Sequence, residues 1–176
     1  MRGFTLIELM VVLAMIVVLA SIAAPNFQRS IARQKTSVAA SELLTSVMQA
    51  RSAAITNNQV AYVQPLVSTD WSRGWRIYID VDKDKAFTAG TDTPIATVAA
   101  MDGNVVQNEV ALNAAVGNLI GFDANGYLVG RNAGRVVFGS ALIPAGELRK
   151  GVKVSVTGRA RICTSTTNDN GCSGND

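Results

Sequence analysis

Two arginines near the end of this 176-residue chain have the spacing needed to bind successive phosphates. In the stretch TGRARIC, Arg159 and Arg161 are separated by one residue, and Gly158 directly before them would let a backbone come close. If the stretch is extended, both guanidinium groups leave one face about 6.5 to 7 Å apart, close to the phosphate spacing along a DNA strand. Each guanidinium presents a planar fork to phosphate oxygens, so such contacts would not depend on base sequence.

The charged residues of this chain are unevenly distributed, with a basic region around these arginines and an acidic region earlier in the sequence. Residues 131–161 contain seven basic side chains and one acid, Glu147, whereas residues 70–109 contain seven acids and four bases. A basic region of this kind attracts polyanions. The alternative is that arginines on the exposed face of an edge strand discourage edge-to-edge pairing or form ion pairs with nearby acids. On the DNA-binding interpretation, the patch would also include Arg149, Lys150 and Lys153.

Glu8 is a second residue with possible chemistry, because it is a carboxylate in a stretch that is almost wholly apolar from Phe4 to Ala24. That stretch is about 21 residues long, close to the roughly 20 that a helix needs to cross a bilayer. A charge at the centre of such a helix costs about 2.5 to 3.5 kcal/mol, so a partner is expected. Alternatively, Glu8 lies in the first turn and reaches the headgroups. A cleaved secretory signal fits poorly, because only three residues precede the apolar run and Pro25 follows it directly.

Composition argues against catalysis. The chain has no histidine, the commonest general base and metal ligand. Its two cysteines, Cys163 and Cys172, are too few for a structural zinc site and lack the CxxC spacing. A disulfide or two free thiols remain possible. Since no nucleophile–base pair, phosphate loop or metal cluster is evident, we expect no enzyme activity, no cofactor and no metal.

An acidic stretch, DVDKDKAFTAGTD, resembles a calcium loop only in part. Asp80, Asp82 and Asp84 alternate as in an EF-hand, but Lys85 stands where such a loop needs glycine and Thr91 where it needs a bidentate glutamate. We expect a solvated hairpin turn, with a weak ion site as the alternative.

The elements that must position these residues follow from periodicity. Apolar and small residues recur at three- and four-residue steps up to Asn57-Asn58, which predicts one long helix from 4 to 57. Beyond it the pattern changes to strands separated by Gly, Asn and Asp turns. The Asn-Gly pair in DANGYLV predicts a hairpin, and KVSVTGRARIC is expected to be extended. Short connections favour antiparallel pairing, so the fold class is α+β.

The N-terminal sequence GFTLIELMVVLAMIVVLASIAAPNF resembles the signature of type IV prepilins and pseudopilins. The resemblance implies a leader at 1–3, cleavage after Gly3 by a prepilin peptidase and methylation of Phe4. It also implies that Glu8 pairs with the terminal amine of a neighbouring subunit during assembly and that Pro25 kinks the helix. Residues 4–24 would be the transmembrane segment and later the filament core.

The rest of the chain resembles the FimT-like and pseudopilin H minor subunits. The stretches that carry this resemblance are QARSAAITNN, WSRGWRIYIDVDKD and GFDANGYLV. It implies the type IV pilin fold, with the helix packed on an antiparallel sheet and a β-rich periplasmic head at 58–176 that ends in a basic tail. The Gly-Arg-x-Arg pattern at Gly158, Arg159 and Arg161 is similar to that of FimT-like pilins linked to DNA uptake. A C-terminal disulfide loop between Cys163 and Cys172 is also implied.

We therefore expect a minor type IV pilin, in the pilus or at its tip, that binds DNA for uptake in natural transformation (competence). A structural subunit that primes assembly and motility, and a type II secretion pseudopilin, are the alternatives. Expected partners are other major and minor pilins, the prepilin peptidase, the inner membrane and DNA through its phosphate backbone. Counting the charges that flank the apolar segment mildly favours a cytoplasmic C-terminus. The resemblance instead implies a single-pass inner-membrane protein with its head in the periplasm, and later a place in the pilus fibre at the cell surface.

Overall fold

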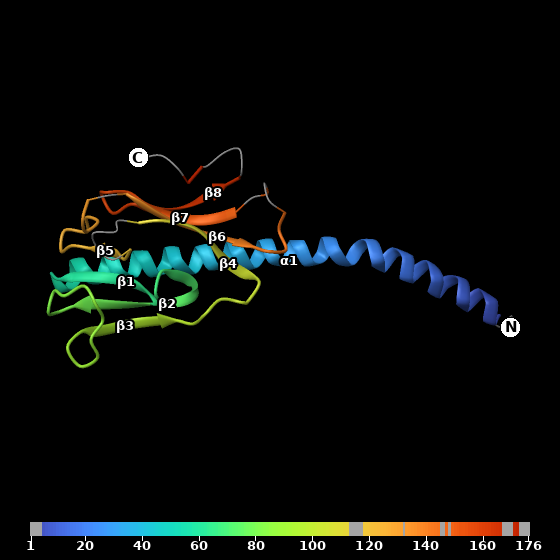
Figure 1. Ribbon diagram of the computed structural model, residues 1–176, viewed down its shortest axis with the longest axis horizontal. Helices are drawn as coiled ribbons and strands as arrows, with labels where there is room; N and C mark the ends of the chain where they lie inside the picture. Colours follow the sequence, from blue (N-terminus) through green and yellow to red (C-terminus); the bar gives the residue numbers. More distant parts are fainter. Residues whose placement is uncertain are drawn as a thin grey trace.

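The computed structural model describes residues 5–112, 118–131, 133–144, 147, 149–166 and 171–172, apart from the side chain of Ile22. Gly3 and Phe4, the residues expected at the processing site, lie outside these ranges. One long helix, α1 (Leu6–Asn57), runs along the molecule, and the strands lie against its C-terminal half to form the head (Figure 1).

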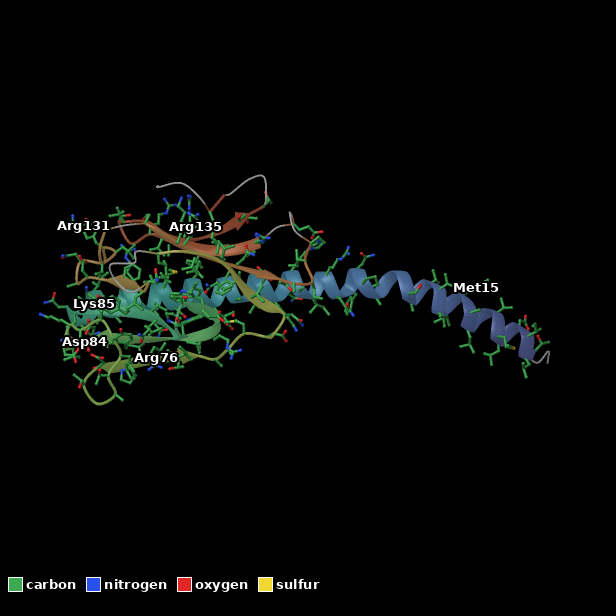
Figure 2. All side chains as sticks on the ribbon, in the orientation of Figure 1. Met15, Arg76, Asp84, Lys85, Arg131 and Arg135 are labelled. Carbon is green, nitrogen blue, oxygen red and sulfur yellow. A yellow bond between two sulfur atoms is a disulfide. The ribbon has the colours of Figure 1, made fainter. Side chains whose placement is uncertain are left out.

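The N-terminal half of α1 projects away from the head and exposes apolar side chains, with Leu6 77% and Leu19 68% exposed. In length and composition this helix is suited to cross a membrane. It continues through Pro25 without interruption, and its projecting part, where Figure 2 labels Met15, is bent relative to the part in the head. A proline inside a helix removes one backbone hydrogen bond and favours a bend. The kink at Pro25 stays a prediction.

The first turn of α1 is closed by a capping box. Thr5 is the N-cap, and its Oγ1 accepts a hydrogen bond from the backbone N–H of Glu8 at 3.3 Å. The Glu8 carboxylate in turn accepts the backbone N–H of Thr5 at 3.3 Å. An acid at this position also suits the helix dipole. Within one subunit, Glu8 therefore has a local structural role.

The first sheet has the strand order β3-β2-β1-β5, and all of its pairs are antiparallel. Chain reversal after α1 uses Asn58 in the left-handed conformation, with φ 52°. The aromatic ring of Tyr62 on β1 covers Gly121 on β5, its cross-strand partner. The strands are β1 (Val60–Val67), β2 (Asp70–Asp80), β3 (Thr93–Val98) and β5 (Ile120–Phe122).

The second sheet has the order β4-β6-β7-β8 and is also antiparallel, with β4 and β8 at its edges. Its strands are β4 (Val105–Ala111), β6 (Gly134–Ser140), β7 (Arg149–Val154) and β8 (Ala160–Ser165). Both sheets pack on α1 and form one core, in which the indole N–H of Trp75 donates to Ser46 Oγ at 2.9 Å. The expected architecture, a long helix on an antiparallel β body, is confirmed.

Some local expectations were wrong. KVSVTGRARIC is not one strand, because it turns after Val154 and returns as β8. Strand β4 was not predicted, since polar residues and a register shift between Gln107 and Glu109 interrupt its alternation. The Asn-Gly turn is present, but it is followed by a single bridge from Phe122 to Leu128 rather than by a second strand.

Candidate functional site

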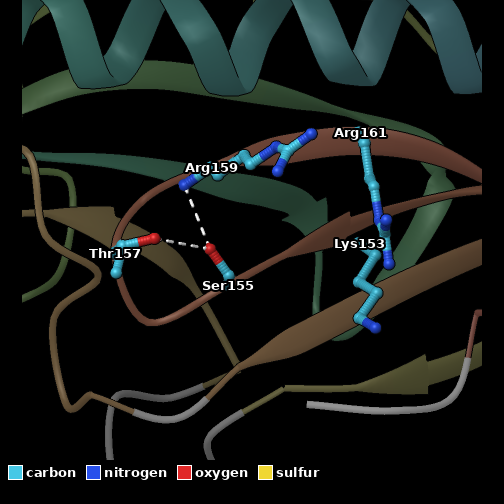
Figure 3. Close-up of a pocket in the computed structure, with 5 residues that line it drawn as sticks. All are labelled: Lys153, Ser155, Thr157, Arg159 and Arg161. Atoms are coloured by element: carbon cyan, nitrogen blue, oxygen red, sulfur yellow. Dashed lines mark hydrogen bonds between the residues drawn. The ribbon is translucent and has the colours of Figure 1, made fainter. Parts of the chain in front are cut away.

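A recess on the second sheet contains three of the basic residues that the sequence singled out (Figure 3). We call it the basic recess; its volume is about 430 Å³. Since β7 places Val152 and Val154 in the core, side-chain alternation puts Lys153 and its cross-strand partner Arg161 on the face turned away from the core. The lining residues are Lys153, Ser155, Thr157, Arg159 and Arg161.

The turn between β7 and β8 positions Arg159 at the rim of this recess. The backbone N–H of Ser155 donates to the carbonyl of Arg159 at 2.9 Å, and that of Gly158 donates to the carbonyl of Ser155 at 2.9 Å. Ser155 Oγ also accepts the backbone N–H of Arg159 at 3.2 Å and lies 2.9 Å from Thr157 Oγ1. The same turn therefore fixes one arginine and brings two hydroxyl groups beside it.

Positive charge is concentrated across three neighbouring strands. Arg135 on β6 is the cross-strand partner of Lys153 on β7, which is the partner of Arg161 on β8. Lys153 is only 4% exposed, and burial, followed by the charges of Arg161 and Arg135, lowers the pKa of its ammonium group. Arg135 forms an ion pair with Glu109 on β4. Like charges on adjacent strands repel, so an anion in the recess would reduce this repulsion.

Two other basic residues that we expected in the patch do not line the recess. Arg149 begins β7 and donates to Asn108 Oδ1 at 2.6 Å. It lies four residue steps along the strand from Lys153, or about 13 Å. Lys150 lies on the opposite face of β7 from Lys153 and donates to Thr164 Oγ1 at 3.1 Å.

Gly158, in the turn between β7 and β8, packs closely against the backbone of another turn. It is buried, with φ +79°, and a Cβ on it would lie 2.0 Å from the carbonyl oxygen of Gly126. The glycine thus allows its own backbone to approach that of Gly126 in the same protein. Arg51 of α1 holds the same contact, since its Nε donates to Gly126 at 3.0 Å and its Nη2 donates to the carbonyl of Thr157 at 3.3 Å. Sequence reasoning missed Arg51, because its partners lie 75 and 106 residues away.

The disulfide between Cys163 and Cys172 joins β8 to the following segment, with the two Cα atoms 5.1 Å apart. Both cysteines are buried and pack against Val137 on β6. Cys163 is two residues beyond Arg161, so this link restrains the strand that carries the recess.

The acidic turn brings four carboxylates together, with oxygens within 4.8 Å of one another: Asp80, Asp82, Asp84 and Asp92. Its two buried members accept backbone N–H groups. Asp80 accepts from Lys83 at 2.8 Å and Lys85 at 3.2 Å, and Asp92 accepts from Val81 at 2.9 Å and Thr88 at 2.7 Å. Burial raises the pKa of Asp80. These hydrogen bonds give Asp80 and Asp92 a structural role, because they hold the backbone of the turn in place.

A family model described as type II transport protein GspH matches residues 39–158. The chain belongs to the GspH family. A second model, the prokaryotic N-terminal methylation motif, matches residues 1–24. The GspH match ends directly before Arg159, so the two arginines of the recess lie beyond the matched residues.

Known proteins similar to this GspH-family chain include a fimbrial protein and a type IV minor pilin. A fimbrial protein of Pseudomonas aeruginosa is 30% identical over 121 residues, which are 62% of this chain and 75% of the relative. Two crystal structures of the type IV minor pilin FimU from the same organism have TM-scores of 0.56 and 0.55 at 19% and 20% identity. The aligned regions cover 78% and 76% of this chain, and 93% and 95% of the two FimU chains.

The family and the fold are those of structural pilin proteins and not of enzymes. The chain is a minor type IV pilin-like or pseudopilin-like protein, and this class associates with other pilins. The apolar helix and the methylation motif indicate anchoring in a membrane. The predictions of family and fold are confirmed.

Proposed function

We propose that this protein is a minor type IV pilin, in the pilus or at its tip, that binds the phosphate backbone of DNA for uptake in natural transformation. The observation that carries the proposal is the convergence of Lys153, Arg159 and Arg161 in one recess beside the hydroxyls of Ser155 and Thr157. Arginine forks and an ammonium group form charge-assisted hydrogen bonds to phosphate, and hydroxyl donors add to them. None of these contacts requires a particular base.

The strength of such binding is bounded by the number of phosphates contacted. A few contacts give dissociation constants of about 10⁻⁴ to 10⁻⁶ M at physiological salt. A filament that presents several copies would raise the apparent affinity through effective concentration. We therefore expect weak binding by the isolated chain that weakens further with added salt.

The decisive experiment measures DNA binding across a salt series by the full chain in detergent. The Arg159→Ala/Arg161→Ala variant should bind more weakly, and its slope of log affinity against log salt should be shallower by about two units. Arg73→Ala/Lys83→Ala, which removes two exposed charges from the other sheet and its turn, should behave as wild type. Equal binding by wild type and the recess variant would reject DNA binding at this site.

We also propose the biogenesis that the N-terminal motif supports. A prepilin peptidase cleaves after Gly3 and methylates Phe4, the apolar part of α1 resides in the inner membrane, and the head faces the periplasm before it enters the fibre. Glu8 and Pro25 act in assembly. The match of the methylation motif to residues 1–24 supports the processing steps.

A secretion pseudopilin is the second candidate, because the matching family model is described as a type II transport protein. The curated relative is instead a fimbrial protein, which favours a pilus. Deleting the gene distinguishes them, since loss of exoprotein export with intact pili would establish the secretion role. Loss of pili would indicate the structural priming role, whereas a DNA receptor should be dispensable for piliation.

A further inference from the structure

A second concavity, the α1–β8 groove, adjoins the basic recess and differs from it in chemistry. Its volume is about 430 Å³, which is larger than the volume of a single nucleobase. Two of its apolar side chains are well exposed, with Met48 60% and Ile55 49% exposed. Apolar residues on its walls are Val47, Met48, Ile55 and Ala160, and two arginines, Arg51 and Arg159, also line it.

Arg159 connects the two concavities, because it lines both of them. A DNA strand with one phosphate at Arg159 would therefore have the attached nucleoside within reach of the groove. In a duplex the faces of the bases are covered by their stacked neighbours, and the phosphates lie outside. Only an unpaired base could place its apolar face in the groove.

The groove has the features that bind an unpaired base. Thioether and aliphatic side chains provide contact to an aromatic face, and methionine sulfur interacts favourably with such rings. An arginine plane also stacks on bases. The guanidinium of Arg51 is held by the carbonyls of Gly126 and Thr157. These hydrogen bonds use two of its five N–H donors and lie in its plane, so they leave its faces uncovered.

We propose that the α1–β8 groove receives an unpaired nucleobase while the neighbouring phosphates bind in the basic recess, so that the site prefers single-stranded DNA to duplex. This inference rests on the proposed function, since it assumes that the recess binds phosphate. It adds a surface that contacts the base and includes Met48 and Ile55 of α1. Neither residue was among those that the sequence predicted to bind DNA.

The test uses the full chain in detergent and three probes at one salt concentration. The probes are a short single strand, the duplex of the same sequence, and an abasic strand of the same length that keeps every phosphate. Wild type should bind the single strand most tightly. The Met48→Ala/Ile55→Ala variant should bind the single strand about fivefold more weakly than wild type. Its affinity for the abasic strand should equal that of wild type. Alanine suits a helix, so this variant should fold.

Ile31→Ala/Val38→Ala is the matched control, because it trims two exposed apolar residues of the same helix away from the groove. It should bind all three probes as wild type does. Equal wild-type affinity for the base-bearing and abasic strands, an equal loss for both in the groove variant, or tighter binding to duplex would overturn the inference.

The failure of this inference and that of the proposed function give different results. If Arg159→Ala/Arg161→Ala weakens binding to the abasic strand and the groove variant changes nothing, the phosphate site stands and the base-binding groove is rejected. If the arginine variant leaves abasic binding unchanged, the phosphate site is rejected, and the groove inference is rejected with it.

Discussion

At the scale of single residues, Gly158 joins the candidate site to the packing of the head. A side chain there would meet both the carbonyl oxygen of Gly126, at 2.0 Å, and Nε of Arg51, at 2.9 Å. Its φ of +79° lies in a region that favours glycine. Arg159 is the next residue, so the position of its backbone depends on this glycine.

Two glycine-to-alanine variants can separate the free-energy cost of a steric clash from that of an unfavourable backbone conformation. They replace Gly158 and Gly90. Gly90→Ala meets the same conformational penalty at φ +91° but has open space around it, and should lose about 1 kcal/mol of unfolding free energy. Gly158→Ala must also displace Gly126 and should lose about 3 kcal/mol or more. Denaturant unfolding of both variants measures the difference. Equal losses would show that the contact with Gly126 adjusts at little cost.

Glu8 has two possible roles that single substitutions can separate. Glu8→Gln keeps an oxygen able to accept the Thr5 N–H but removes the charge, whereas Glu8→Val removes both. If charge pairing drives assembly, both variants should be processed normally and fail to enter filaments. Immunoblots of sheared fibres and of membranes measure this. Normal incorporation of Glu8→Gln would assign Glu8 to helix capping alone, and normal incorporation of Glu8→Val would reject any need for the acid.

At the scale of elements, the β7–β8 hairpin is held by three kinds of contact. It pairs with β6 on one side, Arg51 of α1 binds its turn, and the disulfide restrains the end of β8. Among the described residues β8 is an edge strand, with β7 as its one neighbouring strand. The disulfide should therefore contribute to the stability of this hairpin.

Removing the disulfide by Cys163→Ser/Cys172→Ser should lower the unfolding free energy by about 2 to 3 kcal/mol, because the unfolded chain regains the freedom of a short loop. Calorimetry with and without reductant measures the effect. Reductant should lower the Tm of the wild type and leave that of the variant unchanged. A wild-type Tm insensitive to complete reduction would show that the covalent link adds nothing to packing around Val137.

The first sheet carries a tyrosine cluster that predicts alkaline sensitivity. Burial, and then the charge of Asp80, raises the pKa of Tyr62 from 10.0 to about 12, and the pKa of Tyr78 is raised by the same causes. The folded state thus holds these protons more tightly than the unfolded chain does. The contribution of Tyr62 to stability is complete below pH 10 and is lost as the pH rises to about 12. The pKa of Tyr78 is raised further, so its contribution persists to higher pH.

Denaturant unfolding at stepped alkaline pH tests this. Tyr62→Phe should make the decline in unfolding free energy between pH 10 and about 12 shallower, with Tyr78 still contributing its part. At neutral pH the variant should be close to the wild type, since it removes only the hydroxyl. Equal slopes for wild type and variant would contradict a role for Tyr62.

At the scale of the whole molecule, α1 joins a buried half to an exposed apolar half. In the head, Leu43 and Val47 are fully buried under both sheets, whereas Leu6 is 77% exposed. Ion pairs join Arg33 to Glu147 and Lys35 to Asp102, but exposed pairs of this kind contribute about 0 to 1 kcal/mol. Core burial therefore fixes the head on the helix, and the projecting half requires a membrane or neighbouring helices.

Processing and orientation give a prediction at this scale. Intact-mass analysis of the protein from fibres should show a chain that starts at Phe4 and carries one added methyl group. Protease added to spheroplasts should digest the head and leave the apolar part of α1 protected. A chain that retains Met1 in fibres would reject cleavage, and a head protected until the membrane is dissolved would reject the periplasmic orientation.

The sequence by itself determined the features that depend on near neighbours along the chain. The helix, its apolar half and its end near Asn57 follow from local periodicity and turn residues. The Thr5–Glu8 capping box belongs with them, since its signature is a threonine followed three residues later by a glutamate. The spacing of Arg159 and Arg161 was enough to nominate both for one site.

Only the tertiary structure decided which other groups belong to that site. Strand register placed Lys153 beside Arg161 and turned Lys150 to the opposite face, although both lysines had seemed equivalent in the sequence. Arg51 reached the turn from a helix 106 residues away. The physical reason is that periodicity is a local property, whereas strand partners and helix contacts are set by how distant segments bury their apolar faces together.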